Sequence, residues 1–448
     1  MLDPIKYKTK RYLHFDHRVK IGTVESYVTN PQKMMKHSFL PFIHYVNSFY
    51  KNTGKKNSEI QNRPIKKKNR DIMYAGHLDN YIYKYYADSL NDAYNIWTEN
   101  HKIDECSTAY RNHKNGKSNI DFAAEIINTI ISFEQAYILV GDFSHFFDKI
   151  DHKILKKNLL TVLNQPKLYS DWFNVYKSIT KYGYYEKAFL SNLFGTDKEM
   201  KKSKRTSYFD TLMEFRKFQK ENPTQKNENK FGIPQGTAIS AVFANVYAIE
   251  FDLAIKKMAD RYLGFYRRYS DDFILVIPKK QGQREVSIND FKKLEREVRN
   301  LTKENKIIIQ EEKTGLYSYS HSTITNITLQ KSHHLDYLGF IFDGKTVRMR
   351  GKSPYKFYRK AYQLIDKAKK VKANQNMNYL PYRKRIYSLY TDLGINKGEF
   401  GNFITYAKRA QEKFDQISPH TENLMLQQIK NRKKKIEDKL GMRIHTKI

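Results

Sequence analysis

The feature that most constrains this chain is a pair of adjacent carboxylates, Asp271 and Asp272, set between two stretches of strand-forming residues. The segment 264–269 before the pair is rich in aromatic and basic residues, and the apolar run 273–277 after it is followed by Pro278. This pattern predicts two short strands joined by a turn that carries both carboxylates. Because burying two carboxylates without a counter-charge is costly, the turn either binds a divalent metal or is an ordinary polar hairpin tip.

The charge balance predicts a polyanionic partner. The chain has 448 residues, enough for two or three domains, with 81 Lys and Arg against 47 Asp and Glu and a formal net charge of +34. Nucleic acid is the simplest polyanion for so large an excess, and the 34 Tyr and 27 Phe suit stacking on unpaired bases. A compositional bias would explain the abundance of Tyr and Asn but not the large excess of Lys over Glu.

Cysteine usage and hydropathy exclude other classes. Cys106 is the one cysteine, so an intrachain disulfide framework and a Cys-ligated zinc site are excluded. The N-terminus has no apolar signal segment, and no apolar run reaches the length of a membrane span. We therefore expect a cytoplasmic protein without a membrane partner.

Asp142 follows the apolar strand pattern at 136–141, and a turn then leads into a helix that ends at 163. An Asp at the end of a buried strand stands where layered folds bind ligands, although it is also a common helix cap. A Gly/Pro turn at 231–240 precedes an expected helix at 241–258. Its glycines allow close backbone approach to a ligand, and the helix start offers free N–H groups.

The remaining pattern is mixed helix and strand. It predicts helices at 78–97, 120–133 (capped by Ser118) and 288–306, a strand at 307–310, a hairpin at 335–344, a loop at 52–69, a mostly helical segment at 164–230 and a basic helical region at 353–448. The charged helix near 430–435 faces either nucleic acid or water.

Five motifs in one order resemble those of a reverse transcriptase between about residues 60 and 345. They are the segments 142–152 and 232–245, the tetrapeptide Tyr269-Ser-Asp271-Asp272, the pair Lys313-Thr314, and 337–340. A Tyr-x-Asp-Asp tetrapeptide alone would be weak evidence, so the resemblance rests on the order of all five motifs. The segments 70–83 and 109–120 are most similar to bacterial defence-associated reverse transcriptases of the abortive-infection type.

The resemblance implies an α+β fold, the right-hand polymerase with fingers, a palm with an antiparallel sheet, and a helical C-terminal thumb. It divides the chain into a basic N-terminal extension at 1–60, fingers and palm at 61–345, and a basic α-helical thumb at 346–448.

The resemblance also implies catalytic roles. Asp142 and Asp271 would hold two Mg²⁺ ions about 3.5–4 Å apart, one activating the primer 3′-hydroxyl and one stabilising the leaving pyrophosphate. Asp272 would be a ligand at some stages, and the backbone carbonyl of Phe143 would be a further oxygen ligand. Lys313 would protonate or neutralise the pyrophosphate.

Other residues would contact the substrates. Phe147 would exclude a ribose 2′-hydroxyl, unless Phe146 and Phe147 are both core aromatics, and Gln235 would touch the sugar of the incoming dNTP. The triphosphate would be held by Arg70 with Lys67 or Lys68. Template and primer would be contacted by Arg111, Lys117, Tyr337, Leu338, Gly339 and Phe340. Asp148 and His152 are expected to be a helix cap and a polar helix residue.

The implied function is RNA-directed synthesis of DNA, in which dNTPs are added to a 3′-hydroxyl on an RNA template. The similarity extends this to antiphage defence with a noncoding RNA. Alternatives are a retron-like or group II intron-like enzyme, a maturase-like RNA-binding protein without synthesis, and an RNA-dependent RNA polymerase, against which Phe147 argues. The sequence segments typical of retron enzymes are not evident. Because no cysteine follows Cys106 in the sequence, the Cys-rich nuclease that often accompanies group II intron enzymes is not expected. Protein priming and homo- or hetero-oligomers are left open.

Overall fold

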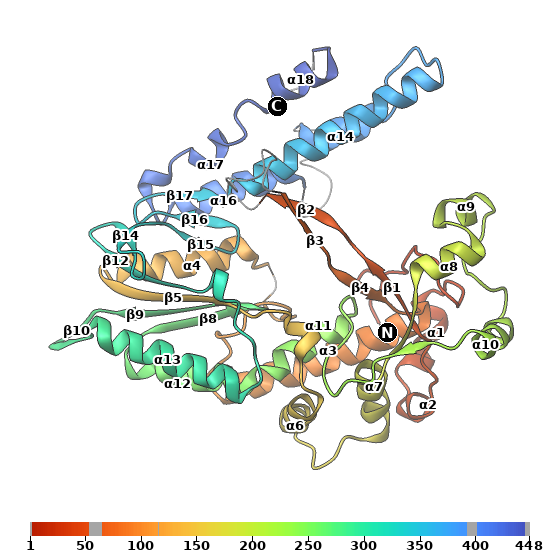
Figure 1. Ribbon diagram of the computed structural model, residues 1–448, viewed down its shortest axis with the longest axis horizontal. Coiled ribbons are helices and arrows are strands. Elements are labelled where there is room, and N and C mark those ends of the chain that lie inside the picture. The colour runs from red at the N-terminus through yellow and green to blue at the C-terminus, as the bar shows by residue number, and fades with distance from the viewer. Residues whose placement is uncertain (1, 53–64, 115, 392–400, 444–448) are drawn as a thin grey trace, which may run out of the picture.

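A six-stranded antiparallel sheet forms the centre of the computed structural model, which describes residues 2–52, 65–114, 116–391 and 401–443 (Figure 1). The order of its strands is β14 (Lys331–Ser332), β13 (Thr323–Asn326), β12 (Gly315–Ser320), β5 (Ala136–Asp142), β9 (Asp272–Pro278) and β8 (Phe265–Tyr269). The hairpin β8–β9 confirms the two strands predicted around the Asp pair. A small hairpin, β10 (Lys280–Gln281) with β11 (Arg284–Glu285), follows β9.

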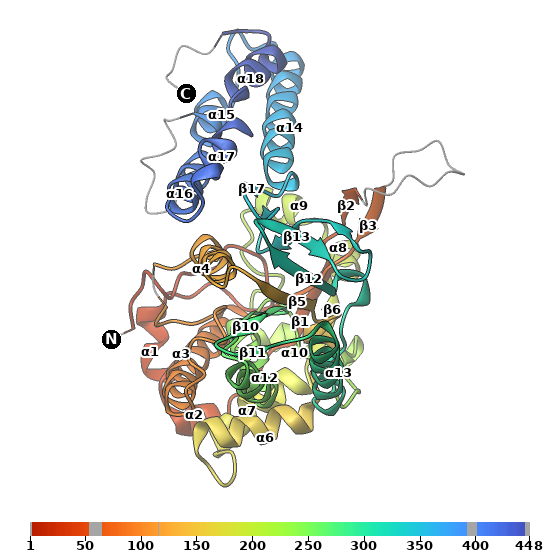
Figure 2. The same cartoon turned by 90° about the vertical axis from the view of Figure 1, so that its left-hand side faces the viewer.

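Side chains of the central strands alternate between two apolar cores. Leu139 and Leu275 face the core shared with α12 (Ile249–Arg261) and α13 (Ile288–Glu304), whereas Ile138 and Ile274 face the core shared with α4 (Asn119–Ser132). Figure 2 shows these helices on opposite sides of the sheet. Because a one-residue slip would exchange the two faces, burial on both sides holds the register of β5 against β9.

The fingers carry a second sheet and a set of helices. The sheet order is β4 (Asp71–Tyr74), β1 (Phe42–Val46), β6 (Gly183–Glu186) and β7 (Gln225–Lys226), and β2 (Phe49–Asn52) pairs with β3 (Ile65–Lys68) as a separate hairpin. The helices are α1 (Ile21–Val28), α2 (Pro31–Met35), α3 (His77–Asn100), α7 (Ser170–Thr180), α8 (Lys187–Phe194), α9 (Asp197–Lys202) and α10 (Leu212–Glu221). There are three further helices, α5 (Phe146–Lys149), α6 (His152–Leu163) and α11 (Ala238–Tyr247), of which α11 contacts the other two, and α6 and α11 also pack against α3.

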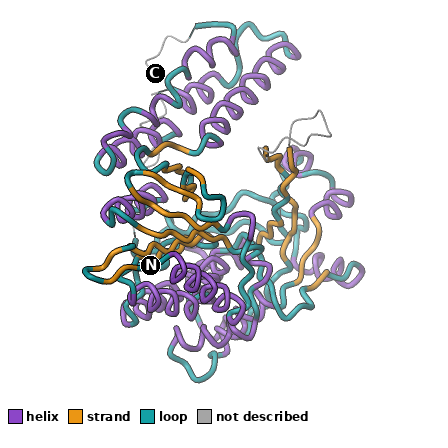
Figure 3. Tube along the Cα trace, turned by 60° about the vertical axis from the view of Figure 1, so that its left-hand side comes forward, coloured by secondary structure: helices purple, strands orange, loops and turns teal. Residues whose placement is uncertain are grey.

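The C-terminal region is helical above the palm, as predicted (Figure 3). It begins after a three-stranded sheet of β15 (Leu335–Tyr337), β16 (Phe340–Phe342) and β17 (Val347–Met349). Its helices are α14 (Lys352–Asn374), α15 (Arg383–Tyr390), α16 (Phe403–Asp415), α17 (Leu424–Gln427) and α18 (Arg432–Leu440). One apolar core joins these helices to α4 and the sheet, so the thumb is packed onto the palm.

The helix predicted at 241–258 is in fact two helices, so that prediction was wrong. α11 and α12 meet at Ala248 with a bend of 47°. The side-chain amide of Asn158, fully buried on α6, donates hydrogen bonds to the carbonyls of Val246 and Tyr247 at 3.2 and 2.9 Å. These bonds satisfy carbonyls at the end of α11 and allow the chain to turn there.

Smaller differences concern strands. The expected strand at 307–310 is a single bridge between Ile309 and Phe143. The predicted loop at 52–69 contains β3, while 53–64 lie outside the described residues. β6 and β7 lie within the segment 164–230, which had been predicted to be mostly helical. In the described part of the chain, no single helix is long and apolar enough to span a membrane, and only the bent pair α11–α12 passes that test.

Several residues between 7 and 42 are buried in the main core of the fingers and palm. Ile21 and Val28 of α1 and Met34 of α2 are buried in the same apolar core as α3 and α11. The carboxylate of Asp16 accepts hydrogen bonds at 3.0 Å from the amides of His77 and Leu78 and so caps the start of α3. The proposed domain boundary at residue 60 falls outside the described residues, and the division into domains stays a prediction.

We predict that Asn158→Ala lowers thermal stability more than Asn192→Ala, an exposed control on α8. The substitution removes two buried hydrogen bonds and leaves carbonyl groups unsatisfied, which costs about 1–3 kcal/mol. Differential scanning fluorimetry of the two variants beside wild type measures the difference. Equal melting temperatures for both variants would contradict this account of the helix break.

Candidate active site

Three carboxylates meet at one end of the palm sheet. In the β5–β9 ladder Asp142 stands directly opposite Asp272, and Asp271 belongs to the turn between β8 and β9. The amide of Phe143 donates a 2.8 Å hydrogen bond to the carbonyl of Asp271, which ties the end of β5 to that turn. Asp142 is buried and the other two are half-buried. The sheet register therefore brings together the three acids that the sequence singled out.

The three carboxylates repel one another. Burial, followed by the charges of Asp271 and Asp142, raises the pKa of Asp272 to about 7. Burial and the charge of Asp142 likewise raise the pKa of Asp271 above its usual value. Such a set of oxygen ligands, crowded and short of positive charge, fits a hard divalent cation.

Lys313 supplies one positive charge to this cluster. It lies at the end of the short helix η1 (Glu311–Lys313), and its Nζ is 2.5 Å from Oδ2 of Asp142. The amide of Gln310 donates to the carbonyl of Asp142 at 2.8 Å, which holds this segment beside β5. The lysine side chain remains 39% exposed, so it is able to reach a ligand in front of the carboxylates.

A buried positive charge, which sequence reasoning missed, lies beneath the turn. The guanidinium of Arg268 is fully buried and donates to both carboxylate oxygens of Asp252, at 2.8 and 2.6 Å. Its third arm donates to the carbonyl of Ser270 at 2.9 Å, one residue before Asp271. Period-two alternation places Arg268 on the same strand face as buried Tyr266, and that was the available signal.

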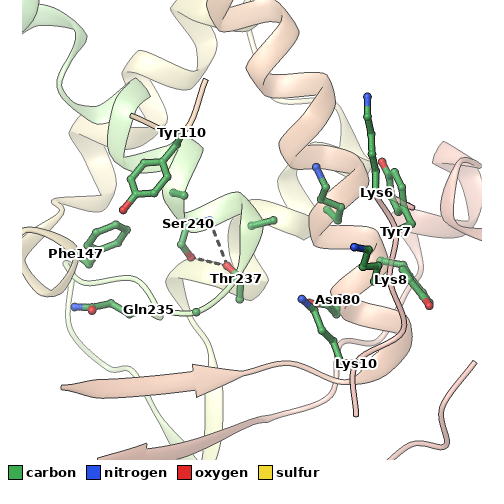
Figure 4. A pocket seen from close by; sticks show the side chains of 15 residues that line it. Lys6, Tyr7, Lys8, Lys10, Asn80, Tyr110, Phe147, Gln235, Thr237 and Ser240 are labelled. Atoms are coloured by element: carbon green, nitrogen blue, oxygen red, sulfur yellow. Dashed lines mark hydrogen bonds between the residues drawn. The ribbon is translucent and has the colours of Figure 1, made fainter. Parts of the chain in front are cut away.

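A cavity of about 530 Å³ opens between fingers and palm (Figure 4). We call it the fingers–palm pocket, and it is lined on one side by Phe147, Gln235 and Tyr110 and on the other by Lys6, Lys8 and Lys10. The three lysines were not predicted as site residues, although their alternate spacing in the sequence was a signal.

The two adjacent phenylalanines lie in different environments, which was one of the two expected alternatives. Phe146 is buried among core aromatics, whereas Phe147 is half-buried and lines the fingers–palm pocket. The role of Phe147 as a steric gate stays a prediction.

The Gly/Pro turn is bound closely to the fingers. The carbonyl of Gln235 accepts a 2.8 Å hydrogen bond from the amide of Met73 on β4, and its side chain donates to Asp148 at 3.3 Å. Gly236 has φ of +126°, and a Cβ there would lie 2.4 Å from the carbonyl oxygen of Met73. Only glycine fits so close an approach without strain.

The prediction that Arg111 binds template phosphates is wrong. Its guanidinium is buried, and its five N–H groups donate to acceptors of Asn95, Asp104, Ser107 and Thr98. Arg111 therefore holds the loop 104–111 against α3. The sequence could not show this, because a turn rich in basic residues has the same local pattern whether its arginine faces solvent or pairs with an acidic side chain inside the fold.

In the segment 337–340, which was predicted to contact the primer, only the two residues at the tip are partly exposed. The side chains of Tyr337 and Phe340 are buried in the palm–thumb core, where Phe340 lies 4.8 Å from the ring of Phe414. Leu338 and Gly339 form the half-exposed turn, with φ of +45° and +95°. For these two residues the contact stays a prediction.

Several other assignments stay predictions. Lys67, Lys68, Arg70 and Lys117 are exposed, as basic contacts to nucleotide or template require, and the metal ligation by the carbonyl of Phe143 is untested. His152 is structural, with Nε2 at 2.8 Å from the carbonyl of Gly232. The cap of α6 is Asp151, whose carboxylate accepts from the amides of Lys153 and Ile154, and not Asp148.

Another acidic group, formed by Glu99, Asp104 and His113, lies at the end of α3. Burial alone would raise the pKa of Asp104, but hydrogen bonding to Lys114 and the charge of Arg111 hold it below its usual value. Both carboxylate oxygens of Asp104 already bind these cations. This group is therefore an ion-pair network and does not suit a metal.

The comparisons with known proteins identify the family of the chain. The family model described as reverse transcriptase (RNA-dependent DNA polymerase) matches residues 98–342, more than half of the chain. The chain therefore belongs to the reverse transcriptase family, a family of nucleotidyltransferases, and its α+β right-hand fold is the one predicted. None of the curated proteins matches the chain.

Solved structures of telomerases are among those to which the chain is similar. The apo telomerase from Candida tropicalis, truncated from the C-terminal domain, is 12% identical over 74% of this chain and 61% of that chain, with a TM-score of 0.42. The telomerase from Candida albicans in complex with a TWJ fragment of telomeric RNA is 13% identical over 94% and 63%, with a TM-score of 0.40. The chain thus spans less than two thirds of either telomerase chain.

We predict that the repulsion within the carboxylate cluster makes stability pH-dependent. In the folded protein the pKa of Asp272 lies near 7, above its ordinary 3.8, so its contribution to stability is lost as the pH rises from about 4 to about 7. In EDTA, the melting temperature of Asp272→Asn should therefore fall less than that of wild type as the pH rises over this range.

The matched control is Asp438→Asn, which removes an exposed carboxylate of α18. It should follow wild type at every pH. Mg²⁺ should raise the melting temperature of wild type and of this control more than that of Asp272→Asn. Parallel pH profiles for all three proteins would contradict the proposed repulsion.

Proposed function

We propose that this protein is an RNA-directed DNA polymerase that joins dNTPs to a 3′-hydroxyl with the help of two divalent metal ions, Mg²⁺ in the cell. The observation that carries the proposal is the meeting of Asp142, Asp271 and Asp272 at the end of the palm sheet, beside Lys313. Family membership and the high positive charge of the chain support it.

The three carboxylates would hold the metal ions. Bound there, two Mg²⁺ ions would act as Lewis acids that stabilise the attacking and the leaving oxygens of the phosphoryl transfer. Lys313 is placed to exchange its contact with Asp142 for one with the leaving pyrophosphate, which it would neutralise. Arg268, through the carbonyl of Ser270, would keep the turn with Asp271 and Asp272 in place during this exchange.

The role of the carboxylates in DNA synthesis is tested with protein that is purified together with the nucleic acid that it carries. Wild type, Asp271→Asn/Asp272→Asn and the control Asp438→Asn receive Mg²⁺ and labelled dNTPs, and the carried RNA and the product are sequenced. We expect DNA complementary to a carried RNA from wild type and from the control, and none from the double variant.

Other results of this experiment separate the alternatives. DNA of low complexity that is unrelated to the RNA would indicate untemplated synthesis. RNA that is tightly held without any DNA product would favour a maturase-like RNA-binding protein. Labelled DNA that stays with the protein through phenol extraction would indicate protein priming.

Phe147 is expected to select the sugar. Its side chain lines the fingers–palm pocket next to Gln235, and a smaller residue would leave space for a 2′-hydroxyl. Phe147→Ala should raise ribonucleotide incorporation relative to deoxynucleotide incorporation by about 10-fold or more, the discrimination that one apolar contact provides. Ratios of kcat/KM for each NTP–dNTP pair measure the effect.

The control for this prediction is Phe173→Ala, which removes an exposed ring on α7. It should leave the ratio unchanged. An unchanged ratio for Phe147→Ala as well would show that this residue is not the gate, and would reopen the RNA-dependent RNA polymerase alternative.

We further propose a cytoplasmic enzyme of bacterial antiphage defence that works with a noncoding RNA template. The similarity of 70–83 and 109–120 to defence-associated reverse transcriptases supports this over a retron-like or group II intron-like role. In a bacterial host, wild type but not Asp271→Asn/Asp272→Asn should reduce phage plating, and one RNA should dominate the copurified pool. Equal plating with both proteins would remove the defence role without affecting the polymerase proposal.

A further inference from the structure

Another cavity lies where the start of α6 meets the end of α13. Its volume is about 380 Å³, and we call it the α6–α13 pocket. Its lining combines lysines with apolar side chains, and it consists of Lys149, Asp151, Phe231, Lys303, Lys306, Ile307 and Ile308. No binding or catalytic role was predicted for any of these side chains.

The ring of Phe231 is presented to this pocket by a fixed backbone and is 37% exposed. The amide of Gly232, the next residue, donates a 2.9 Å hydrogen bond to the carbonyl of Ile150. Phe231 itself pairs with Asp151 in an isolated bridge. The ammonium group of Lys149 lies 4.6 Å from the centre of the Phe231 ring. This wall therefore offers an aromatic ring, held in place, with a cation beside it.

The other wall follows α13. Its residue Ile308 is 48% exposed, whereas Ile307 beside it is buried. Lys306 joins this wall to the first, because its Nζ lies 2.7 Å from Oδ2 of Asp151. The pocket is therefore a cleft between two connected segments, and each segment contributes apolar surface.

The pocket carries an excess of positive charge. Lys306 pairs with Asp151, which also caps α6. The other two lysines, Lys149 and Lys303, are exposed and form no ion pair within the described part of the chain. Two free ammonium groups beside an exposed aromatic ring suit a ligand that combines a flat ring with negative charge.

The size of the cavity restricts this ligand further. Small-molecule sites have volumes of about 300–1,000 Å³, so a cavity of about 380 Å³ suits one nucleotide and not several. The base of a nucleotide would stack on Phe231, and its phosphates would reach Lys149 and Lys303.

This pocket differs from the sites described above. Among its described lining residues are none of the three clustered carboxylates and neither Phe147 nor Gln235. It is nevertheless connected to the carboxylates through the backbone. The carbonyl of Ile308 accepts a 2.7 Å hydrogen bond from the amide of Ser144, two residues after Asp142. An occupant would therefore contact a segment that is bound to the end of β5.

We propose that the α6–α13 pocket binds one nucleotide outside the catalytic site, with its base on Phe231 and its phosphates on Lys149 and Lys303. The nucleotide is either free or part of a strand, and both present the same chemistry to this pocket. The inference goes beyond the proposed polymerase function and does not depend on it, because these contacts need neither metal ions nor the clustered carboxylates.

The test measures binding of radiolabelled ATP by equilibrium dialysis in EDTA, which removes binding through metal ions. Wild type is compared with Lys149→Ala/Lys303→Ala and with Phe231→Leu, which keeps an apolar side chain but removes the ring. The double alanine variant should bind ATP about 10-fold more weakly, or weaker still, because hydrogen bonds to charged groups are lost. Phe231→Leu should weaken binding by about 5-fold to 100-fold, as expected for the loss of one stacked base.

Two controls match the lysine variant. Lys292→Ala/Lys293→Ala removes the same charge from exposed positions of α13 and should bind ATP as wild type does. Lys149→Arg/Lys303→Arg keeps the charge and should keep the affinity. Melting temperatures of all variants separate a loss of binding from a loss of folding.

Unlabelled competitors show which parts of the nucleotide are recognised. Adenosine and tripolyphosphate should each displace labelled ATP about 10-fold less effectively than ATP does, or worse, because each lacks one of the two contacts. A short single-stranded RNA that displaces ATP more effectively than ATP itself would show that the nucleotide belongs to a strand. A less effective RNA would show that it is free.

Each other result overturns the inference. Wild type that binds no ATP in EDTA, or unchanged binding by either pocket variant, would mean that the pocket takes no nucleotide. Displacement by adenosine or by tripolyphosphate that equals displacement by ATP would mean that only half of a nucleotide is recognised. Loss of ATP binding in Asp271→Asn/Asp272→Asn would place the nucleotide at the carboxylates.

Failure of the polymerase proposal is recognised separately. If wild type makes no DNA but binds ATP through Phe231 and the two lysines, the pocket remains a nucleotide site and only the polymerase function fails. If wild type makes DNA but binds no ATP in EDTA, the polymerase function stands and this inference fails.

Discussion

The buried ion pair between Arg268 and Asp252 is the interaction on which the carboxylate-bearing end of the palm sheet depends. Both side chains are fully buried, and the pair joins strand β8 to helix α12. Taking two charges out of water is costly, and removal of one partner from such a pair typically costs about 3–5 kcal/mol. Here the cost is offset by further hydrogen bonds, from Tyr266 to Asp252 at 2.7 Å and from Arg268 to Ser270 at 2.9 Å. The pair thereby fixes the backbone that carries Asp271 and Asp272.

A rigid support is needed because the carboxylates above it oppose their own assembly. Burial and mutual repulsion raise the pKa values of Asp271 and Asp272, and one lysine, Lys313, offsets part of the charge. The strands β5 and β9 stay paired because apolar residues on both faces of the sheet bury them. Hydrophobic packing and the buried pair therefore hold together carboxylates that repel one another.

The pocket beside this cluster joins distant parts of the chain. The turn at Gln235 is bound to β4, and the N-terminal segment is bound to α3 by Tyr7 and Thr9. One apolar core connects α1, α2 and α3 with α11 and the palm strands. The two walls of the fingers–palm pocket therefore belong to one packed body, in which Lys6, Lys8 and Lys10 face Phe147 across the cavity.

The sequence alone determined what depends on neighbouring residues. The strands around Asp271, the helix that Ser118 caps and the glycine turn at Gly236 were predictable, because alternation, caps and tight turns act over a few positions. Tertiary structure decided the rest. Arg111 is structural because Asp104 and Asn95 surround it, and the helix ends near Ala248 because Asn158 binds its last carbonyls. A side chain's role in these cases depends on partners brought near by folding, and no local pattern records them.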